Sequence, residues 1–314
     1  MSATLSDRRI ETVTLLVNPA AGGGRGEKVA DRAATRLRAH GLAVTCVAGA
    51  GAEESLDLAR RAVADGADAL VVCGGDGMVS IAVQALASSD VPVGIIPAGT
   101  GNDLAREYGI PLGDPEAAAD VIAAGRVETV DLGLATPDGG QPKVFASVLC
   151  AGLDSKVNRR VNEMGLLRGP LRYVLASIIE FPTYRPRRFR MVFDAGLPGE
   201  DTVETDVLLS AFAITRSYGG DMKIAPDADR GDGLVDVCYV GRISKLRFMR
   251  HFPKIYSGTH VGLRGVTTRR CRTVRLEASD VEAYADGDAV APLPVTVEVL
   301  PGAGRFLVPR GPLQ

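Results

Sequence analysis

Closely spaced cysteines, histidines and long apolar runs are all scarce in this sequence. The five cysteines are scattered and never occur in a C-x-x-C spacing, so neither a disulfide framework nor a zinc site is predicted. The three histidines lie away from any candidate nucleophile motif, so Ser-His or Cys-His catalysis is not indicated. Carboxylates are therefore the expected acid and base groups.

The distribution of apolar residues along the sequence also predicts no membrane-spanning or secretory segment. No apolar run approaches the roughly 20 residues that a spanning helix needs, and the first segment, "MSATLSDRRIETV", has no uninterrupted apolar stretch. We therefore expect a cytoplasmic protein. A length of 314 residues with 46% hydrophobic and 24% charged residues is typical of a soluble globular chain with room for two domains.

The net charge of -2 conceals a difference between the two parts of the chain. Residues 1–130 carry 11 Lys and Arg against 17 Asp and Glu, whereas residues 131–314 carry 25 against 21. The basic part is the candidate to meet an anionic surface, although scattered solvated arginines explain the same counts. Nucleic acid is not among the expected partners.

The first 130 residues alternate between apolar runs and helical patterns. Such strict alternation predicts a parallel sheet covered by helices on both faces. The predicted helices cover residues 27–40, 52–65, 79–87 and 104–108, and one that follows the cap Asp114 and ends at Gly125.

After about residue 130 the pattern changes to strands, which predicts a β-rich domain with antiparallel sheets. Two helical segments are expected within it, at Leu171–Glu180 and Ser244–Tyr256. The boundary falls near Val127–Asp131, giving an α/β domain over residues 1–130 and a β-rich domain over residues 131–314. The last strand, at about 300–314, is a candidate to pack back on the first domain.

Three glycine-rich turns follow strands of the α/β domain: "NPAAGGGRG", "GGDG" and "PAGTGND". Ligands of open parallel sheets bind outside the carboxyl ends of the strands, where glycine permits a close approach and helix N-termini attract phosphate. Three such turns at one sheet edge favour phosphate binding over turn formation alone. Neither the P-loop nor the dinucleotide fingerprint is present.

Five motifs together carry a resemblance to a known family. They resemble, in order and over nearly the whole chain, the motifs of the diacylglycerol kinase catalytic-domain family, the soluble bacterial lipid kinases related to sphingosine kinases. The resemblance implies an ATP-binding, NAD kinase-like α/β domain, a lipid-substrate domain built as an antiparallel sandwich, and Mg²⁺-dependent transfer of the ATP γ-phosphate to a lipid hydroxyl such as that of diacylglycerol, which would give phosphatidic acid. The motifs are Leu15–Gly24, Gly74–Met78, Pro97–Arg106, Ile224–Val237 and Tyr284–Asp288.

The resemblance also assigns ATP-binding residues. Asp76 would face the phosphates or their magnesium ion, although a helix N-cap carboxylate is the alternative. Asn102 and Asp103 also suit helix capping. The ATP-binding residues implied by the family are Asn18, Pro19, Ala20, Ala21, Gly22, Gly74, Gly75, Asp76, Gly77, Met78, Val79, Ser80, Thr100, Asn102 and Asp103.

Two acidic turns in the β-rich domain complete the implied site. Asp229 and Asp232, with the backbone carbonyl of Leu234, would hold a structural Mg²⁺, for which a plain acidic turn is the alternative. Asp286 would lie near the catalytic Mg²⁺, and Asp288 would be the general base for the lipid hydroxyl. Asp-Gly turn formation alone explains the same residues.

The sequence departs from the family pattern at Met78, where threonine is usual, and at Asp288, where glutamate is usual. The segment Val47–Gly51 also lacks the usual threonine. Two other readings stay open. One is an NAD kinase or phosphofructokinase-like enzyme, because those related folds also use a "GGDG" turn for phosphates. The other, which Met78 and Asp288 motivate, is a nucleotide- or lipid-binding homologue without activity.

A homodimer through an edge strand of the second domain is a further hypothesis.

A lipid substrate requires docking on a membrane surface, and two basic segments, near residues 185–190 and 246–254, are candidates for it. The second segment is a predicted amphipathic helix. Core packing is the usual fate of the apolar residues of such a helix, and we expect it here. The candidate residues are Arg185, Arg187, Arg188 and Arg190 in the first segment, and Arg247, Arg250 and Lys254 with the apolar Leu246, Phe248, Met249 and Phe252 in the second.

Overall fold

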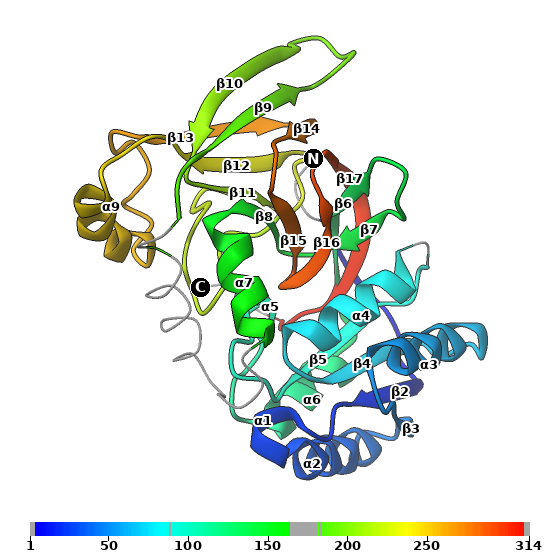
Figure 1. Ribbon diagram of the computed structural model, residues 1–314. Coiled ribbons are helices and arrows are strands. Elements are labelled where there is room, and N and C mark those ends of the chain that lie inside the picture. The colour runs from blue at the N-terminus through cyan, green and yellow to red at the C-terminus, as the bar shows by residue number, and fades with distance from the viewer. Residues whose placement is uncertain (1–3, 88, 164–180, 182–183, 311–314) are drawn as a thin grey trace. The chain divides into compact units, whose positions relative to one another are not determined.

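The computed structural model describes residues 4–87, 89–163, 181 and 184–310 (Figure 1). The chain divides into two compact units. The N-terminal unit contains Met1–Asp131 and Gly302–Gln314, and the C-terminal unit contains Leu132–Pro301. No helix among the described residues combines the length and the apolar character that crossing a bilayer requires.

A parallel sheet with the order β5-β4-β2-β3 forms the centre of the N-terminal unit, as predicted. β4 and β5 are buried throughout because helices cover both faces of the sheet. α2 packs with α6 on one face, and α3 packs with α4 on the other. The elements are β2 (Thr12–Val17), α1 (Ala21–Gly24), α2 (Gly26–Ala39), β3 (Ala43–Ala48), α3 (Ala52–Ala64), β4 (Ala69–Gly74), α4 (Asp76–Leu86), β5 (Val93–Pro97), α5 (Asp103–Glu107) and α6 (Pro115–Ala123).

Helix α4 begins at Asp76, three residues before the predicted start at Val79. The prediction was wrong because the glycines of the motif indicated a longer turn, whereas only Gly75 lies between β4 and the helix, where it serves as the N-cap. Asp76 therefore lies in the first turn of the helix, where a negative charge is favoured by the helix dipole. By contrast, the predicted cap of α6 is confirmed, since the Asp114 carboxylate accepts a hydrogen bond of 3.1 Å from the Ala117 N–H.

Residues from the far end of the chain complete the N-terminal unit. β17 (Val295–Leu307) passes from one unit into the other at Gly302, and its residue Phe306 pairs with Val93 of β5 in parallel orientation. The Phe306 ring is fully buried and stacks on Tyr108 with the ring centroids 4.4 Å apart. β1 (Thr4–Asp7) pairs with the first residues of β6 (Arg126–Pro137).

The C-terminal unit is an antiparallel sandwich, as predicted. One sheet has the order β10-β9-β14-β17 and the other the order β13-β12-β11-β8-β15-β16. A single core cluster unites Met191 and Leu276 of the first sheet with Leu149 and Phe212 of the second. The strands are β7 (Lys143–Phe145), β8 (Val148–Gly152), β9 (Arg187–Phe193), β10 (Asp201–Val207), β11 (Leu209–Ala213), β12 (Val235–Val240), β13 (Val266–Cys271), β14 (Thr273–Glu277), β15 (Glu282–Ala285) and β16 (Asp288–Pro292).

The helices of the C-terminal unit differ in part from the prediction. α7 (Leu153–Glu163) was not predicted, and the helix expected at Leu171–Glu180 lies outside the described residues. The helix expected at Ser244–Tyr256 is present as α9 (Lys245–His251), followed by a 3₁₀ turn η1 (Phe252–Ile255). The Ser244 hydroxyl caps α9 by accepting a hydrogen bond of 3.3 Å from the Arg247 N–H.

Candidate functional site

The three glycine-rich turns meet at the carboxyl ends of β2, β4 and β5, which confirms that they share one edge of the sheet. A Cβ atom added to Gly99 would lie 2.4 Å from the Gly75 Cα atom, so the second and third turns are in backbone contact. A Cβ atom added to Gly22 would lie 3.0 Å from the carbonyl oxygen of Ala98, which brings the first turn against the third. Glycine is needed at these positions because any side chain would push the turns apart.

The first turn is shaped by Asn18 and by three consecutive glycines. The Asn18 side-chain oxygen accepts a hydrogen bond of 3.0 Å from the Ala20 N–H. Gly22, Gly23 and Gly24 all have positive φ values, of 58°, 75° and 90°. Successive residues of this kind turn main-chain N–H groups toward one side and form anion-binding concavities.

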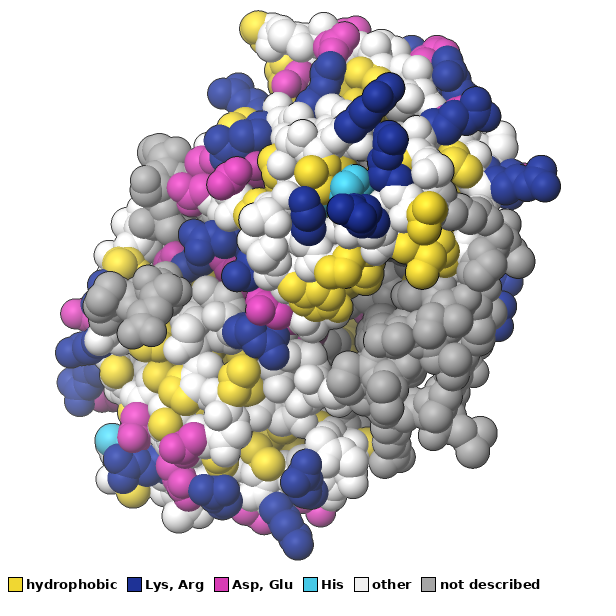
Figure 2. Space-filling model, turned by 90° about the vertical axis from the view of Figure 1, so that its left-hand side faces the viewer, with side chains coloured by type: hydrophobic (Ala, Val, Ile, Leu, Met, Phe, Trp, Pro, Cys, Tyr) yellow, Lys and Arg dark blue, Asp and Glu magenta, His cyan; other side chains and the backbone are white. Residues whose placement is uncertain are grey.

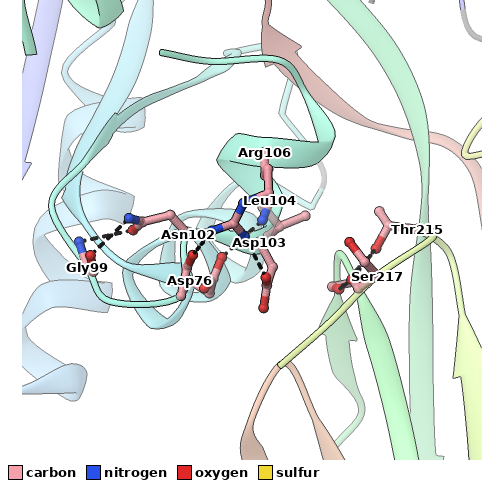
Figure 3. Close-up of polar contacts among 10 residues, drawn as sticks. Asp76, Gly99, Asn102, Asp103, Leu104, Arg106, Thr215 and Ser217 are labelled. Atoms are coloured by element: carbon pink, nitrogen blue, oxygen red, sulfur yellow. Dashed lines mark hydrogen bonds and ion pairs between the residues drawn. The ribbon is translucent and has the colours of Figure 1, made fainter. Parts of the chain in front are cut away.

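Asp76 connects the second turn to the third (Figure 3). Its carboxylate does not cap its own helix but accepts a hydrogen bond of 3.0 Å from the Leu104 N–H, at the start of α5. A Cβ atom added to Gly101 would lie 2.9 Å from the other carboxylate oxygen. Burial, and then the nearby charge of Asp103, raise the pKa of Asp76. The second turn therefore holds a carboxylate against the main-chain N–H groups at the start of α5.

The third turn is held by side chains from its own motif (Figure 3). Asn102 has a left-handed backbone with φ of 56°, and its amide both accepts from the Gly99 N–H at 3.0 Å and donates to the Gly99 carbonyl at 2.9 Å. Asp103 is buried and pairs with Arg106 at 2.9 Å. Arg106 also donates to the Gly101 carbonyl at 2.9 Å. These side chains shape the loop and leave Thr100 exposed at its tip.

The other residues of the second motif lie beneath the site. Met78, Val79 and Ser80 are buried in α4. The Met78 side chain fills the space beside Gly74, where an added Cβ atom would lie 2.5 Å from its Cγ atom. Gly77 differs from them, because it is exposed and a Cβ atom added to it would meet nothing within 4 Å.

In the C-terminal unit, Asp286 and Gly287 form the two-residue turn between β15 and β16. Both have positive φ values, of 50° and 86°, as a hairpin turn of this length requires. The Asp286 carboxylate accepts hydrogen bonds from the N–H groups of Ala146 at 2.8 Å and Ser147 at 2.9 Å. The Ser147 hydroxyl lies in turn 3.0 Å from that of Thr215. Asp286 is therefore fixed in position by its neighbours.

Asp288, at the start of β16, is more accessible. Its side chain is 55% exposed, and one of its oxygens lies 3.4 Å from the amino nitrogen of Lys143 on β7. Lys143 was not predicted, and no local signal in the sequence points to it, because it precedes Asp288 by 145 residues. The arrangement places a solvent-reachable carboxylate beside a largely buried cation.

The acidic turn at Asp229 and Asp232 is organised by local hydrogen bonds. Asp229 accepts from the Gly231 N–H and Asp232 accepts from the Leu234 N–H, each at 3.0 Å. Asp232 also forms an ion pair with Arg270 of β13. This arginine was not predicted from the sequence, since it follows Asp232 by 38 residues.

Asp236 adds a further carboxylate to this turn. Burial, and then the charges of Asp227 and Asp229, raise its pKa to about 6, even though the Arg270 guanidinium lies 3.2 Å away. The described residues contain no group of three or more His, Cys, Asp or Glu placed to hold a metal. Carboxylate oxygens are nevertheless the donors that a hard cation such as Mg²⁺ prefers, and Arg270 compensates only part of their negative charge, through Asp232 and Asp236.

A parallel-sheet unit with three joined glycine turns and an antiparallel sandwich define the fold of lipid kinases related to NAD kinases. Residues 12–135 match the family model of the diacylglycerol kinase catalytic domain, and residues 147–308 match that of the YegS C-terminal NAD kinase β-sandwich-like domain. The chain is 44% identical over 306 residues to a diacylglycerol kinase of Mycobacterium tuberculosis, covering 98% of each protein. It belongs to the diacylglycerol kinase family of lipid kinases.

More distant relatives agree with this assignment. A diacylglycerol kinase of Bacillus subtilis is 27% identical over 256 residues, covering 80% of each protein. The crystal structure of a diacylglycerol kinase from Bacillus anthracis shares the fold, with a TM-score of 0.72, 19% identity, and coverage of 96% of this chain and 98% of the other.

Proposed function

We propose that the protein transfers the γ-phosphate of ATP to the hydroxyl of diacylglycerol or a similar membrane lipid, giving phosphatidic acid, and that it does so as a cytoplasmic enzyme at the inner membrane face. The observation that carries the proposal is the contact of three glycine turns at the ends of β2, β4 and β5. Phosphoryl transfer depends mainly on positioning and on neutralising charge. An edge rich in main-chain N–H donors supplies both to a triphosphate.

ATP would bind along this edge through the residues that the family resemblance names. Main-chain N–H groups of Gly22 and of Gly75 to Gly77 are the proposed phosphate donors. Asn18, Ala20 and Ala21 already donate their N–H groups within the protein, so they would shape the first turn around the phosphates. Thr100, exposed at the tip of the third turn, is a proposed side-chain contact. Met78 and Ser80 are buried, so we assign them to the support of the loop.

Asp288 is the proposed general base. The lipid hydroxyl oxygen forms a bond to the γ-phosphorus while the bond from that phosphorus to the bridging oxygen breaks, Asp288 takes the hydroxyl proton, and ADP leaves. The accessible side chain of Asp288 suits this role better than that of Asp286, whose carboxylate already accepts two main-chain hydrogen bonds. Lys143 would hold Asp288 in position.

Magnesium is the proposed cofactor, and when bound it neutralises phosphate charge. Asp76 and Asp286 are the proposed neighbours of the catalytic ion. Asp229, Asp232 and the carbonyl of Leu234 are the proposed ligands of a structural ion. The oxygen donors and the excess negative charge around Asp236 support this second assignment.

The test is transfer of labelled phosphate from ATP with Mg²⁺ to diacylglycerol, monoacylglycerol, ceramide or sphingosine in mixed micelles. NAD and fructose 6-phosphate serve as soluble acceptors. We expect label in a phospholipid and its loss in Asp288→Asn. Label in NAD or the sugar alone would move the assignment to a soluble kinase. No transfer to any acceptor, with ATP still bound, would indicate a homologue without activity.

A further inference from the structure

A short surface segment of the C-terminal unit concentrates exposed apolar side chains. Among the described residues, seven large apolar side chains are exposed, and four of them lie between Leu246 and Tyr256 on α9 and η1. Leu246 is 81% exposed and Met249 is 63% exposed. The expectation that these two residues pack in the core is therefore wrong. We call Leu246, Met249, Phe252 and Tyr256, with the cations next to them, the α9 surface.

Aromatic contacts fix this segment to the unit while its outer side stays free. Phe248 stacks on Phe181 with a centroid distance of 4.9 Å and lies 5.7 Å from Phe252. Phe248 also packs against the buried cluster that includes Leu208 and Val240. Because Phe248 faces inward, Leu246 and Met249, three residues apart, share the outward side of the helix.

Uncompensated positive charge surrounds these apolar side chains. Between Asp236 and Glu277 the sequence has ten Lys and Arg and no Asp or Glu. Arg247, Arg250 and Lys254 are exposed and make no ion pair with the described residues. Figure 2 shows this face, where Lys and Arg side chains gather around a histidine directly beside groups of hydrophobic side chains.

The other basic segment, near β9, is different. Arg188 lies 3.3 Å from Glu204 of the neighbouring strand β10, and Arg190 lies 3.1 Å from Glu277 of β14. These partners compensate two of the four arginines, whereas Arg185 and Arg187 are exposed and form no ion pair with the described residues. No large apolar side chain is exposed beside them, so of the two segments only the α9 segment combines unpaired cations with exposed apolar side chains among the described residues.

We propose that the α9 surface is the membrane-docking surface, and that its partner is an anionic phospholipid leaflet. Leu246 and Met249 would enter the acyl boundary, Tyr256 would lie at the headgroup level, and the three cations would meet lipid phosphates. The inference rests on the lipid kinase reaction proposed above, because a diacylglycerol acceptor lies in a bilayer.

The test is co-sedimentation of the full chain with vesicles of phosphatidylcholine alone or with increasing phosphatidylglycerol. We expect binding to increase with the anionic fraction and to fall as salt is raised. The triple variant Arg247→Gln, Arg250→Gln, Lys254→Gln should bind about 100-fold more weakly. A matched variant removes the same charge from exposed arginines of the other unit and should bind as the wild type does; it carries Arg9→Gln, Arg60→Gln and Arg61→Gln.

The apolar part of the surface needs its own pair of variants. Leu246→Gln with Met249→Gln keeps good helix-forming residues and should weaken binding to anionic vesicles at least about tenfold. Leu112→Gln with Leu197→Gln changes two exposed leucines elsewhere, which are 44% and 38% exposed, and should have no effect.

Several results would overturn the proposal. Equal binding to neutral and anionic vesicles, or unchanged binding of the triple variant, would exclude docking through these cations. Dimerisation of the wild type in ultracentrifugation that is lost in the Leu246, Met249 variant, without vesicle binding, would make the surface an interface between two copies. Phosphorylation of a short-chain diacylglycerol in detergent micelles, measured in parallel, separates failure of docking from failure of the proposed reaction.

Discussion

Replacing Gly99 by alanine tests the contact that joins the second and third glycine turns. The added methyl would lie 2.4 Å from the Gly75 Cα atom and 2.8 Å from the Asn102 side-chain oxygen. Because carbon atoms in favourable contact lie about 3.5–4.0 Å apart, the turns must separate by about 1 Å. The opposing atom belongs to the backbone and cannot rotate away. We therefore expect a loss of about 1–3 kcal/mol in the free energy of unfolding.

Gly77→Ala, in the same motif, should have the opposite effect on stability. A Cβ atom at Gly77 meets nothing within 4 Å, and alanine favours the first turn of α4 by up to about 1 kcal/mol relative to glycine. The methyl would, however, occupy space that a phosphate at this helix N-terminus needs. We expect a stable protein with a raised KM for ATP.

Urea unfolding measures both stabilities, and hydrogen exchange of the β4 amides assigns each change to the N-terminal unit. Gly51→Ala, which also adds a methyl to open space at the start of α3, controls for the KM of ATP and should leave it unchanged. An unaltered unfolding midpoint for Gly99→Ala would refute the contact between the turns. An unaltered KM for Gly77→Ala would refute phosphate binding at the start of α4.

Three further predictions concern carboxylates of the C-terminal unit. The pKa of Asp236 is raised from 3.8 to about 6, so its charged form opposes folding. The free energy of unfolding should be highest below pH 4 and should decline by at most about 3 kcal/mol as the pH rises through 6. Urea titrations of Asp236→Asn should lack this decline. A difference in stability between this variant and the wild type that does not depend on pH would contradict the prediction. Asp286→Asn tolerates the left-handed backbone but offers one acceptor oxygen to two N–H groups, which should cost about 1–3 kcal/mol and lower the Tm; an unchanged Tm would argue against the anchoring role. Asp288→Asn should reduce kcat about 10²- to 10⁴-fold at unchanged KM for ATP, and Lys143→Gln should reduce kcat less, by about tenfold to a hundredfold; steady-state kinetics in which Lys143→Gln has full activity would remove Lys143 from the site.

The parallel half of the fold was predictable because its signals are local. Apolar runs, helical spacing and glycine turns follow one another regularly, and the contact between turns follows from the parallel sheet. α7 was missed because its sequence, "LDSKVNRRVNE", is mostly polar and lies within a part of the chain where strands predominate. Its residues Leu153 and Val157 are nevertheless buried.

Contacts between distant segments explain most of what the sequence could not predict about the site. The motif identified Asp286, but its hydrogen-bond donors, Ala146 and Ser147, precede it by about 140 residues. Arg270, on β13, likewise pairs with Asp232 in a turn that precedes it by 38 residues. Burial was equally hidden, since Met78 is in the core whereas Met249, also on a helix, is exposed. Side-chain type alone does not determine which face of a helix is covered.

The position of β17 in the chain has a consequence for synthesis. Roughly 170 residues separate Asp131 from Gly302, and at about 5–20 residues per second a ribosome needs about 10–30 s to add them. Throughout that interval β5 is paired with β4 but lacks its second neighbour, β17, and Tyr108 lacks the ring on which it stacks. The parallel sheet that bears the glycine turns is therefore begun before the sandwich and completed only after most of the sandwich strands have been synthesised.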